Sequence, residues 1–332
     1  MDDIARVLPF EPPVWLRNRH LQSILPSLPL RRPALERRAG RLLAASRPLT
    51  LDCGDGVRLL AMHAVQEDIG RPGAEKLLLL HHGWEGSADS LYLLSLGQAA
   101  FDAGFDVVRL NLRDHGTTHH LNRELFHSCR IAEVVGAVRR LQELHPRHEI
   151  SLAGFSLGGN FALRVGARAG TAGLRLKRIV AVCPVLDPAV TLEALERGPA
   201  LYREYFMLKW RRSLARKQAA WPDDYDFSEL VSERSLTAMT ARMVARYTDY
   251  PDLAAYLRGY AITGEALASL ETESRIITSM DDPMILPGDL RRLRRVPALS
   301  IGVTRRGGHC GFVDRPGAPS WIDREVVAEL QR

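Results

Sequence analysis

A serine flanked by two glycines, between a strand-like and a helix-like segment, is the feature that most constrains this chain. Residues 154–158 read Gly-Phe-Ser-Leu-Gly; an apolar run, 149–153, precedes them, and a stretch that favours a helix, 159–164, follows. A turn this sharp brings the two backbones so close that a side chain on either glycine would collide. It would also lift the Ser156 hydroxyl clear of a sheet, within reach of a base. The pattern predicts a nucleophile; the alternative is a glycine-rich connection without chemistry.

Motifs on both sides of this serine favour the catalytic interpretation. Residues 76–81 form an apolar run that predicts a buried parallel strand, and His-Gly-Trp follows at 82–84. Downstream, residues 279–283 contain two aspartates and residues 306–312 contain His309. Serine, then aspartate, then histidine is the chain order of enzymes that present their serine on such a turn.

The composition is that of an ordinary globular protein. The chain has 332 residues, of which 46% are hydrophobic and 25% charged, so its core needs no disulfides. Its four cysteines are far apart and form no C-x-x-C motif, which predicts a reducing compartment and argues against a zinc ribbon. Cys310 directly follows His309. Because adjacent side chains point in different directions, we interpret Cys310 as a packing residue.

The charge pattern bears on partners and location. The net charge is +6, but the arginines are scattered and no basic motif carries interleaved aromatics, so we predict no nucleic-acid partner. Weak association with an anionic membrane surface stays open. No apolar stretch approaches the ~20 residues that span a bilayer. The N-terminus lacks a basic region followed by an apolar one. We therefore expect a cytoplasmic protein.

The rhythm of strands and helices predicts the domain organisation. Residues 48–187 alternate between strand-like and helix-like segments, and the alternation returns over 273–332. This predicts an α/β core with a mostly parallel central sheet and helices on both faces. Residues 188–272 interrupt this alternation, and their sequence predicts a helical cap or lid insertion. Residues 1–47, rich in proline and arginine, are expected to be an arm packed on the body.

Two sets of side chains in the insertion have two interpretations each. Aromatic residues at near-helical spacing either pack on the core or line an acyl pocket under a lid, and we take Tyr205 and Phe206 as candidate substrate-binding residues. Basic residues on the same segment would form a solvated face or a site for an anionic head group. The basic residues are Arg203, Lys209, Arg211, Arg212, Arg216 and Lys217.

The candidate catalytic residues have distinct roles. A serine hydroxyl is a poor nucleophile until a base takes its proton, and His309 is the candidate base because histidine exchanges protons near neutral pH. Asp282 would hold the imidazole in the required tautomer. Asp281 is the close alternative to Asp282, and Asp187, after an earlier strand, is the third candidate.

A tetrahedral oxyanion needs two aimed donors. The backbone N–H groups of Trp84 and Leu157 are the candidates. The many other histidines match no zinc signature, so we predict neither a metal nor a cofactor. We expect His82 and His127 to orient loops near the site and count both as candidate substrate-binding residues.

With these motifs in place, the chain resembles the YheT-like branch of the α/β-hydrolase superfamily, also called hydrolase family 4. The resemblance covers nearly the whole chain, although Trp84 and the loop 111–115 depart from the family pattern. It implies an α/β-hydrolase fold and a carboxylic-ester hydrolase or lipase-like enzyme that needs no cofactor. The matching motifs are residues 17–23, 82–87, 126–128, 156–160, 281–283 and 307–312.

These observations together predict a serine esterase that cleaves esters of apolar acyl groups through an acyl-enzyme. Its substrate would be a small-molecule or lipid ester. Two alternatives remain: a non-catalytic binding module on a hydrolase scaffold, and an acyltransferase or thioesterase that uses the same triad. The sequence does not specify an oligomeric state.

Overall fold

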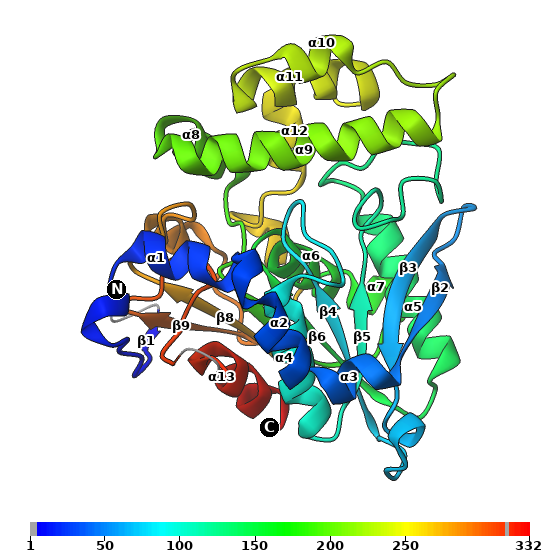
Figure 1. Ribbon diagram of the computed structural model, residues 1–332, viewed down its shortest axis with the longest axis vertical. Coiled ribbons are helices and arrows are strands. Elements are labelled where there is room, and N and C mark those ends of the chain that lie inside the picture. Colours follow the sequence, from blue (N-terminus) through cyan, green and yellow to red (C-terminus); the bar gives the residue numbers. More distant parts are fainter. Residues whose placement is uncertain (1–4, 316–318) are drawn as a thin grey trace.

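The computed structural model describes residues 5–315 and 319–332. Residues 1–4 of the predicted arm and 316–318 of the predicted core lie outside the described residues. Nine strands form one sheet in the order β1-β9-β8-β7-β6-β4-β5-β3-β2 (Figure 1). The strands are β1 (Arg6–Val7), β2 (Ser46–Asp52), β3 (Arg58–Ala64), β4 (Lys76–His81), β5 (Asp106–Leu110), β6 (Glu149–Phe155), β7 (Leu176–Val182), β8 (Ser274–Ser279) and β9 (Leu299–Thr304).

The sheet is mostly parallel, which confirms the predicted fold class. All strands from β4 onward, with β1, pair in parallel, while β3 is antiparallel to both β2 and β5. The central strand β4 is apolar throughout Leu77–Leu80, and all four side chains are fully buried. A strand that is covered on both faces buries every side chain, and its sequence is therefore a continuous apolar run.

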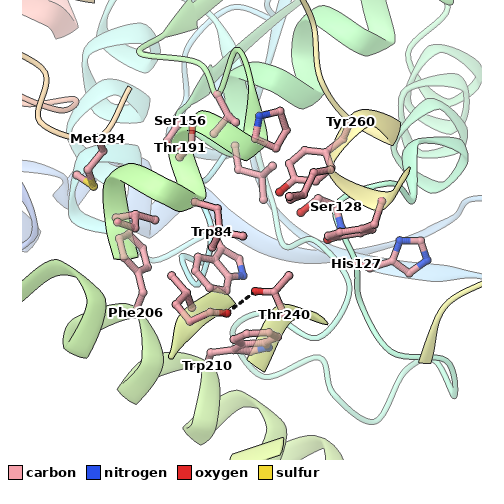
Figure 2. Close-up of a pocket in the computed structure, with 18 of the residues that line it drawn as sticks. Trp84, His127, Ser128, Ser156, Thr191, Phe206, Trp210, Thr240, Tyr260 and Met284 are labelled. Carbon is pink, nitrogen blue, oxygen red and sulfur yellow. Dashed lines mark hydrogen bonds between the residues drawn. The ribbon is translucent and has the colours of Figure 1, made fainter. Parts of the chain in front are cut away.

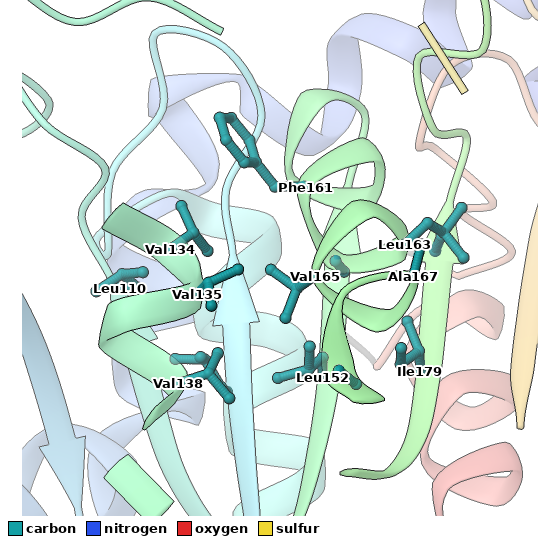
Figure 3. Packing of buried hydrophobic residues seen from close by; sticks show 14 of the residues in the cluster. Leu110, Val134, Val135, Val138, Leu152, Phe161, Leu163, Val165, Ala167 and Ile179 are labelled. Atoms are coloured by element: carbon teal, nitrogen blue, oxygen red, sulfur yellow. The ribbon is translucent and has the colours of Figure 1, made fainter. Parts of the chain in front are cut away.

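Helices cover both faces of the sheet. On one face lie α5 (Ile131–Leu144), α6 (Leu157–Gly166) and the short α7 (Ala169–Ala172). Figure 3 shows valines of α5 and α6 packed against Leu110 and Leu152 of the strands. Each buried leucine or valine side chain contributes about 1.5–3 kcal/mol to stability.

The opposite face is covered by α4 (Leu91–Asp102) and α13 (Trp321–Leu330), together with helices from the N-terminal arm. The start of α13 is fixed by Ser320 and Asp323, which cap each other's backbone N–H groups. The arm consists of short helices because its prolines interrupt longer ones. They are η1 (Val14–Leu16), α1 (Arg19–Ile24), η2 (Leu25–Ser27), η3 (Pro29–Arg31), α2 (Arg32–Arg38) and α3 (Gly40–Ala45).

Five α-helices lie between β7 and β8, within the predicted insertion 188–272, and form a layer above the sheet (Figure 1). We call them the cap. The cap has an apolar cluster of its own, which reaches the body at Leu125 and Met284. That the cap moves as a lid stays a prediction. Its helices are α8 (Pro188–Arg197), α9 (Ala200–Ala220), α10 (Ser228–Ser232), α11 (Leu236–Tyr247) and α12 (Leu253–Gly259).

Three short 3₁₀ helices complete the fold: η4 (Gln66–Ile69), η5 (Glu265–Leu267) and η6 (Pro287–Arg292). Of the helices in the described residues, none combines the length and the apolar character that crossing a bilayer requires.

Candidate active site

Ser156 lies on the sharp turn between β6 and α6 that the sequence predicts. Its φ is +54°, a conformation that non-glycine residues rarely adopt, and its N–H donates to the Val182 carbonyl at 2.9 Å. A Cβ on Gly154 would lie 2.3 Å from the Gly158 oxygen, and one on Gly158 would lie 2.4 Å from the His81 oxygen. Both flanking glycines are therefore required by backbone contact, and the strained serine is held in place by β7.

Asp282 follows β8, and its side chain is fully buried. Its Oδ1 accepts the N–H groups of Met284 and Ile285 at 2.8 and 2.9 Å. Its Oδ2 lies 2.8 Å from Nδ1 of His309. Because the carboxylate can only accept, Nδ1 carries the proton and Nε2 keeps its lone pair.

The two alternative aspartates have other partners. Asp281 Oδ1 accepts the N–H of Gly308 at 2.9 Å and so holds the loop that carries His309. Asp187 caps the N-terminus of α8 and pairs with Arg292 at 2.6 Å. The geometry therefore selects Asp282 as the carboxylate that contacts the imidazole.

Ser156 and His309 line the same two cavities. Within the described part of the chain, no hydrogen bond joins the serine Oγ to the histidine ring. Catalytic hydrogen bonds are often long in the absence of substrate and shorten when it binds.

Helix α1 of the arm supports the His309 loop. Ser23 Oγ accepts the His309 N–H at 2.8 Å. The Gln22 side chain accepts the Val313 N–H and donates to the Val313 carbonyl, both at 2.9 Å. A Cβ on Gly308 would lie 2.4 Å from a carbonyl of α1. Both polar residues belong to a motif that the sequence analysis singled out, but no local signal shows what they contact.

The predicted oxyanion donors are free to act. Among the residues that the structure describes, the N–H groups of Trp84 and Leu157 donate to no acceptor. Leu157 is the first residue of α6, where backbone N–H groups have no partner within the helix. The loop before Trp84 is fixed by the Tyr92 hydroxyl, which accepts the Gly83 N–H at 3.0 Å. Nothing in the sequence identified Tyr92.

His82 supports this loop from its buried side, and it lines neither of the two cavities that Ser156 and His309 line. It is fully buried; its Nδ1–H donates to the Gly83 carbonyl at 2.7 Å and its Nε2 accepts the Leu112 N–H at 3.2 Å. Burial lowers its pKa to about 4, so the ring is neutral. The structure thus places His82 in the loop-orienting position and out of reach of a substrate.

The inner of the two cavities is a mostly apolar chamber of about 100 Å³ (Figure 2). Ser156 and His309 line it together with residues of the cap. His127 lines this chamber; burial lowers its pKa to about 3, and its Nδ1 has no partner among the described residues. The apolar lining includes Trp84, Val185, Leu192, Leu195, Phe206, Trp210, Leu236, Met243 and Leu257.

The outer cavity is larger, about 610 Å³, and charged side chains are among the residues that line it. Phe206 lines both cavities, while Tyr205 lines only the outer one and is 43% exposed. Trp84 stacks on Phe206 with ring centroids 5.3 Å apart, so the loop that carries Trp84 contacts the cap directly. Basic side chains at the rim of the outer cavity are Arg32, Lys209, Arg212 and Arg216.

Lys217 anchors the cap to the body. Its side chain is fully buried, and Nζ lies 2.9 Å from Asp114 Oδ1 and donates to the carbonyls of Asn122 and Glu124 at 2.6 and 3.2 Å. The prediction of a solvated basic face is therefore wrong for this residue. Helical spacing turns Lys217 toward the loop after β5, whereas Arg212 is turned to the rim.

Cys310 packs against the core, as predicted, but its thiol does not point away from His309. Its thiol, the Cys183 thiol and a ring nitrogen of His309 all lie within 4.8 Å of one another. The expected divergence of neighbouring side chains fails because Cys310 has a φ of +58°, which turns the chain.

The comparisons with known proteins identify the fold family of the chain. A family model described as alpha/beta hydrolase fold matches residues 76–316. "Putative esterase YheT" of Escherichia coli (strain K12) is 25% identical over 307 residues, which cover 92% of this chain and 87% of that protein.

Two solved structures share the fold. The esterase Pf2001 of Pyrococcus furiosus is 17% identical, with a TM-score of 0.57 over 88% of this chain and 92% of that one. The carboxylesterase CesB (YbfK) of Bacillus subtilis is 17% identical, with a TM-score of 0.52 over 91% and 97% of the two chains.

Proposed function

Because the chain belongs to the alpha/beta hydrolase fold family, we propose that it is a serine hydrolase that cleaves carboxylic esters. Ser156 would be the nucleophile, His309 the general base and Asp282 the residue that orients the base. The N–H groups of Trp84 and Leu157 would bind the oxyanion. The similarity to an E. coli protein named as an esterase supports the ester class.

One observation carries this proposal. The buried Asp282 carboxylate holds Nδ1 of His309 at 2.8 Å and so leaves Nε2 to accept a proton beside the strained Ser156. A surface histidine with no partner could not be kept in one tautomer in this way.

The reaction follows from these positions. Nε2 of His309 takes the Ser156 proton while Oγ attacks the ester carbonyl, and the oxyanion is bound by the two backbone donors. The imidazolium returns the proton to the leaving alcohol, and an acyl-enzyme remains. Water then attacks the acyl group with the same base, which releases the acid.

The two cavities suggest how an ester would lie. The inner chamber, apolar and closed by the cap, suits an apolar acyl group. The outer cavity, larger and rimmed by cations, suits the alcohol portion. The acyl carbonyl would then sit between Ser156 and the oxyanion donors.

The test compares wild type with Ser156→Ala and, as a matched control, the exposed Ser232→Ala. We expect wild type and Ser232→Ala to react with a fluorophosphonate probe and to hydrolyse aryl esters. We expect Ser156→Ala to lose labelling and to lose turnover by a factor on the order of 10⁴ or more.

Product analysis completes the test. Free acid as the main product, in the presence of an added alcohol, distinguishes hydrolysis from acyl transfer. Equal turnover in wild type and Ser156→Ala would contradict the proposed function.

A further inference from the structure

Three potential metal ligands meet beside the candidate nucleophile. The thiols of Cys183 and Cys310 and one ring nitrogen of His309 lie within 4.8 Å of one another. Zinc in proteins lies about 2.3 Å from cysteine sulfur and about 2.0–2.1 Å from histidine nitrogen, which puts tetrahedral neighbours roughly 3.5–3.8 Å apart. Small side-chain movements are therefore enough to bring the three atoms to ligand distance.

The surroundings of this cluster favour a metal over simple packing. Nδ1 of His309 is engaged by Asp282, so Nε2 is the nitrogen left to coordinate. Histidines that bind metals commonly donate their other ring N–H to a carboxylate in this manner. Two sulfurs and one imidazole form a soft ligand set that selects thiophilic cations over Mg²⁺ or Ca²⁺.

An entry path exists on one side of the cluster. Cys183 is fully buried, but His309 and Cys310 both line the outer cavity, together with Ser156. A cation that enters this cavity meets the exposed edge of the cluster first. The fourth coordination position would face the cavity, where water or the serine hydroxyl is available.

We propose that Cys183, Cys310 and His309 form a binding site for a thiophilic divalent cation such as Zn²⁺, and that the bound cation blocks hydrolysis. Binding replaces two S–H bonds by two metal–sulfur bonds and releases two protons to the solvent. The lone pair of Nε2 is then held by the metal and cannot accept the Ser156 proton. Binding is independent of the proposed function, whereas the inhibition rests on it.

The sequence could not indicate this site because its cysteines are 127 positions apart and follow no zinc spacing. The positive φ angles of Cys183 and Cys310, +43° and +58°, turn both thiols toward each other. Without a metal, burial and the neighbouring Cys183 raise the pKa of the Cys310 thiol well above its usual value.

Cobalt absorption tests the binding. The full chain, freed of metals and kept reduced, is titrated with Co²⁺, whose bonds to thiolates give a charge-transfer band. We expect the band in wild type, in Ser156→Ala and in the control Cys129→Ala, and its loss in Cys183→Ala and Cys310→Ala. Absence of the band in wild type, or its persistence in both of those cysteine variants, would overturn the proposal. If a cysteine variant does not fold, the presence or absence of the cobalt band in wild type still tests the site.

Inhibition by Zn²⁺ tests the consequence. We expect Zn²⁺ to stop ester turnover in wild type and a chelator to restore it. Because each variant lacks a direct ligand, the half-inhibitory concentration should rise by roughly tenfold or more in Cys183→Ala and Cys310→Ala, but not in Cys129→Ala. Equal inhibition of all variants would overturn the inhibitory site. A wild type that gives the cobalt band but hydrolyses no ester supports the metal site and counts against the proposed function.

Discussion

The side-chain oxygen of Ser23 accepts a hydrogen bond of 2.8 Å from the backbone N–H of His309, 286 positions further along the chain. Ser23 Oγ in turn donates to the Arg19 carbonyl at 2.7 Å, so the contact is built into helix α1. Helix α1 thus holds the backbone of His309, the candidate base, and Asp282 holds its imidazole ring.

We predict that Ser23→Ala lowers kcat by roughly tenfold with little change in KM, since loss of about 1 kcal/mol of support displaces the base but not the substrate. The control is Ser232→Ala, at an exposed serine of the cap. Steady-state kinetics across pH separate the two effects. An unchanged kcat in Ser23→Ala would show that α1 does not position His309.

The neighbouring aspartates should behave very differently. Asp282→Asn keeps the shape but loses the acceptor that selects the His309 tautomer, so we expect kcat to fall on the order of 10⁴-fold. Asp281→Asn still offers an oxygen to the Gly308 N–H, and we expect a loss of less than about tenfold. Equal losses in the two variants would contradict the assignment of Asp282.

The buried pair of Lys217 with Asp114, which anchors the cap, should contribute most of the stability of the contact between cap and body. Lys217→Met leaves Asp114 buried without its cation, and we expect a loss of about 3–5 kcal/mol in the free energy of unfolding. Arg242→Met removes the surface pairs with Glu229 and Glu233 and should cost no more than about 1 kcal/mol. Urea unfolding measures both. Similar losses in the free energy of unfolding for the two variants would contradict the role of Lys217 as the anchor of the cap.

Acid should destabilise the protein through its buried histidines. Burial lowers the pKa of His81 and His82 from 6.5 to about 4, and it lowers the pKa of His115 well below 6.5. As the pH falls from 6.5 toward 4, the unfolded chain binds protons that these folded residues do not. Each such proton lowers the free energy of unfolding by about 1.4 kcal/mol per pH unit.

Buried carboxyls act in the opposite direction. Burial raises the pKa of Glu85 from 4.5 to about 8 and that of Asp114 from 3.8 to about 6, so these groups favour the folded state as the pH falls through those ranges. The histidines outnumber them, and four more histidines shift downward as well. We expect urea unfolding to show lower stability at pH 5 than at pH 7, and a steeper decline in Glu85→Gln. Constant or rising stability would contradict this balance.

The face that α11 turns to the inner chamber should set acyl length. Leu236, Thr240 and Met243 line the chamber at helical spacing. Met243→Trp fills space there, so kcat/KM for octanoyl esters should fall by roughly 10- to 100-fold while acetyl esters are little affected. Met280→Trp, at an exposed methionine, is the control. A uniform loss for both acyl lengths would place the acyl group elsewhere.

Local patterns in the sequence were enough to predict the sheet and the pieces of the site. The Ser156 turn, the aspartates after β8 and the His309 loop each follow a strand, and the ends of parallel strands meet at one edge. Their meeting could therefore be expected from order alone. The choice between Asp281 and Asp282 needed coordinates, because both follow the same strand and only one faces the imidazole.

Contacts between distant segments could not be predicted. Strand β1 has only two residues and carries no periodic pattern, although Arg6 and Val7 pair with Gly302 and Val303. The pairing of Lys217 with Asp114 depends on how α9 is rotated over the body. The proximity of Cys183 to Cys310 depends on two backbone turns that composition does not reveal.

The support of the last strand and the base loop by the arm has a consequence for biosynthesis. On the ribosome, residues 5–24 emerge long before their partners, β9 and the loop at 307–313. A nascent chain can form much of the sheet and the serine turn before either partner exists. His309, once made, still needs the arm, so the catalytic geometry that we propose should be complete only after residue 313 has emerged.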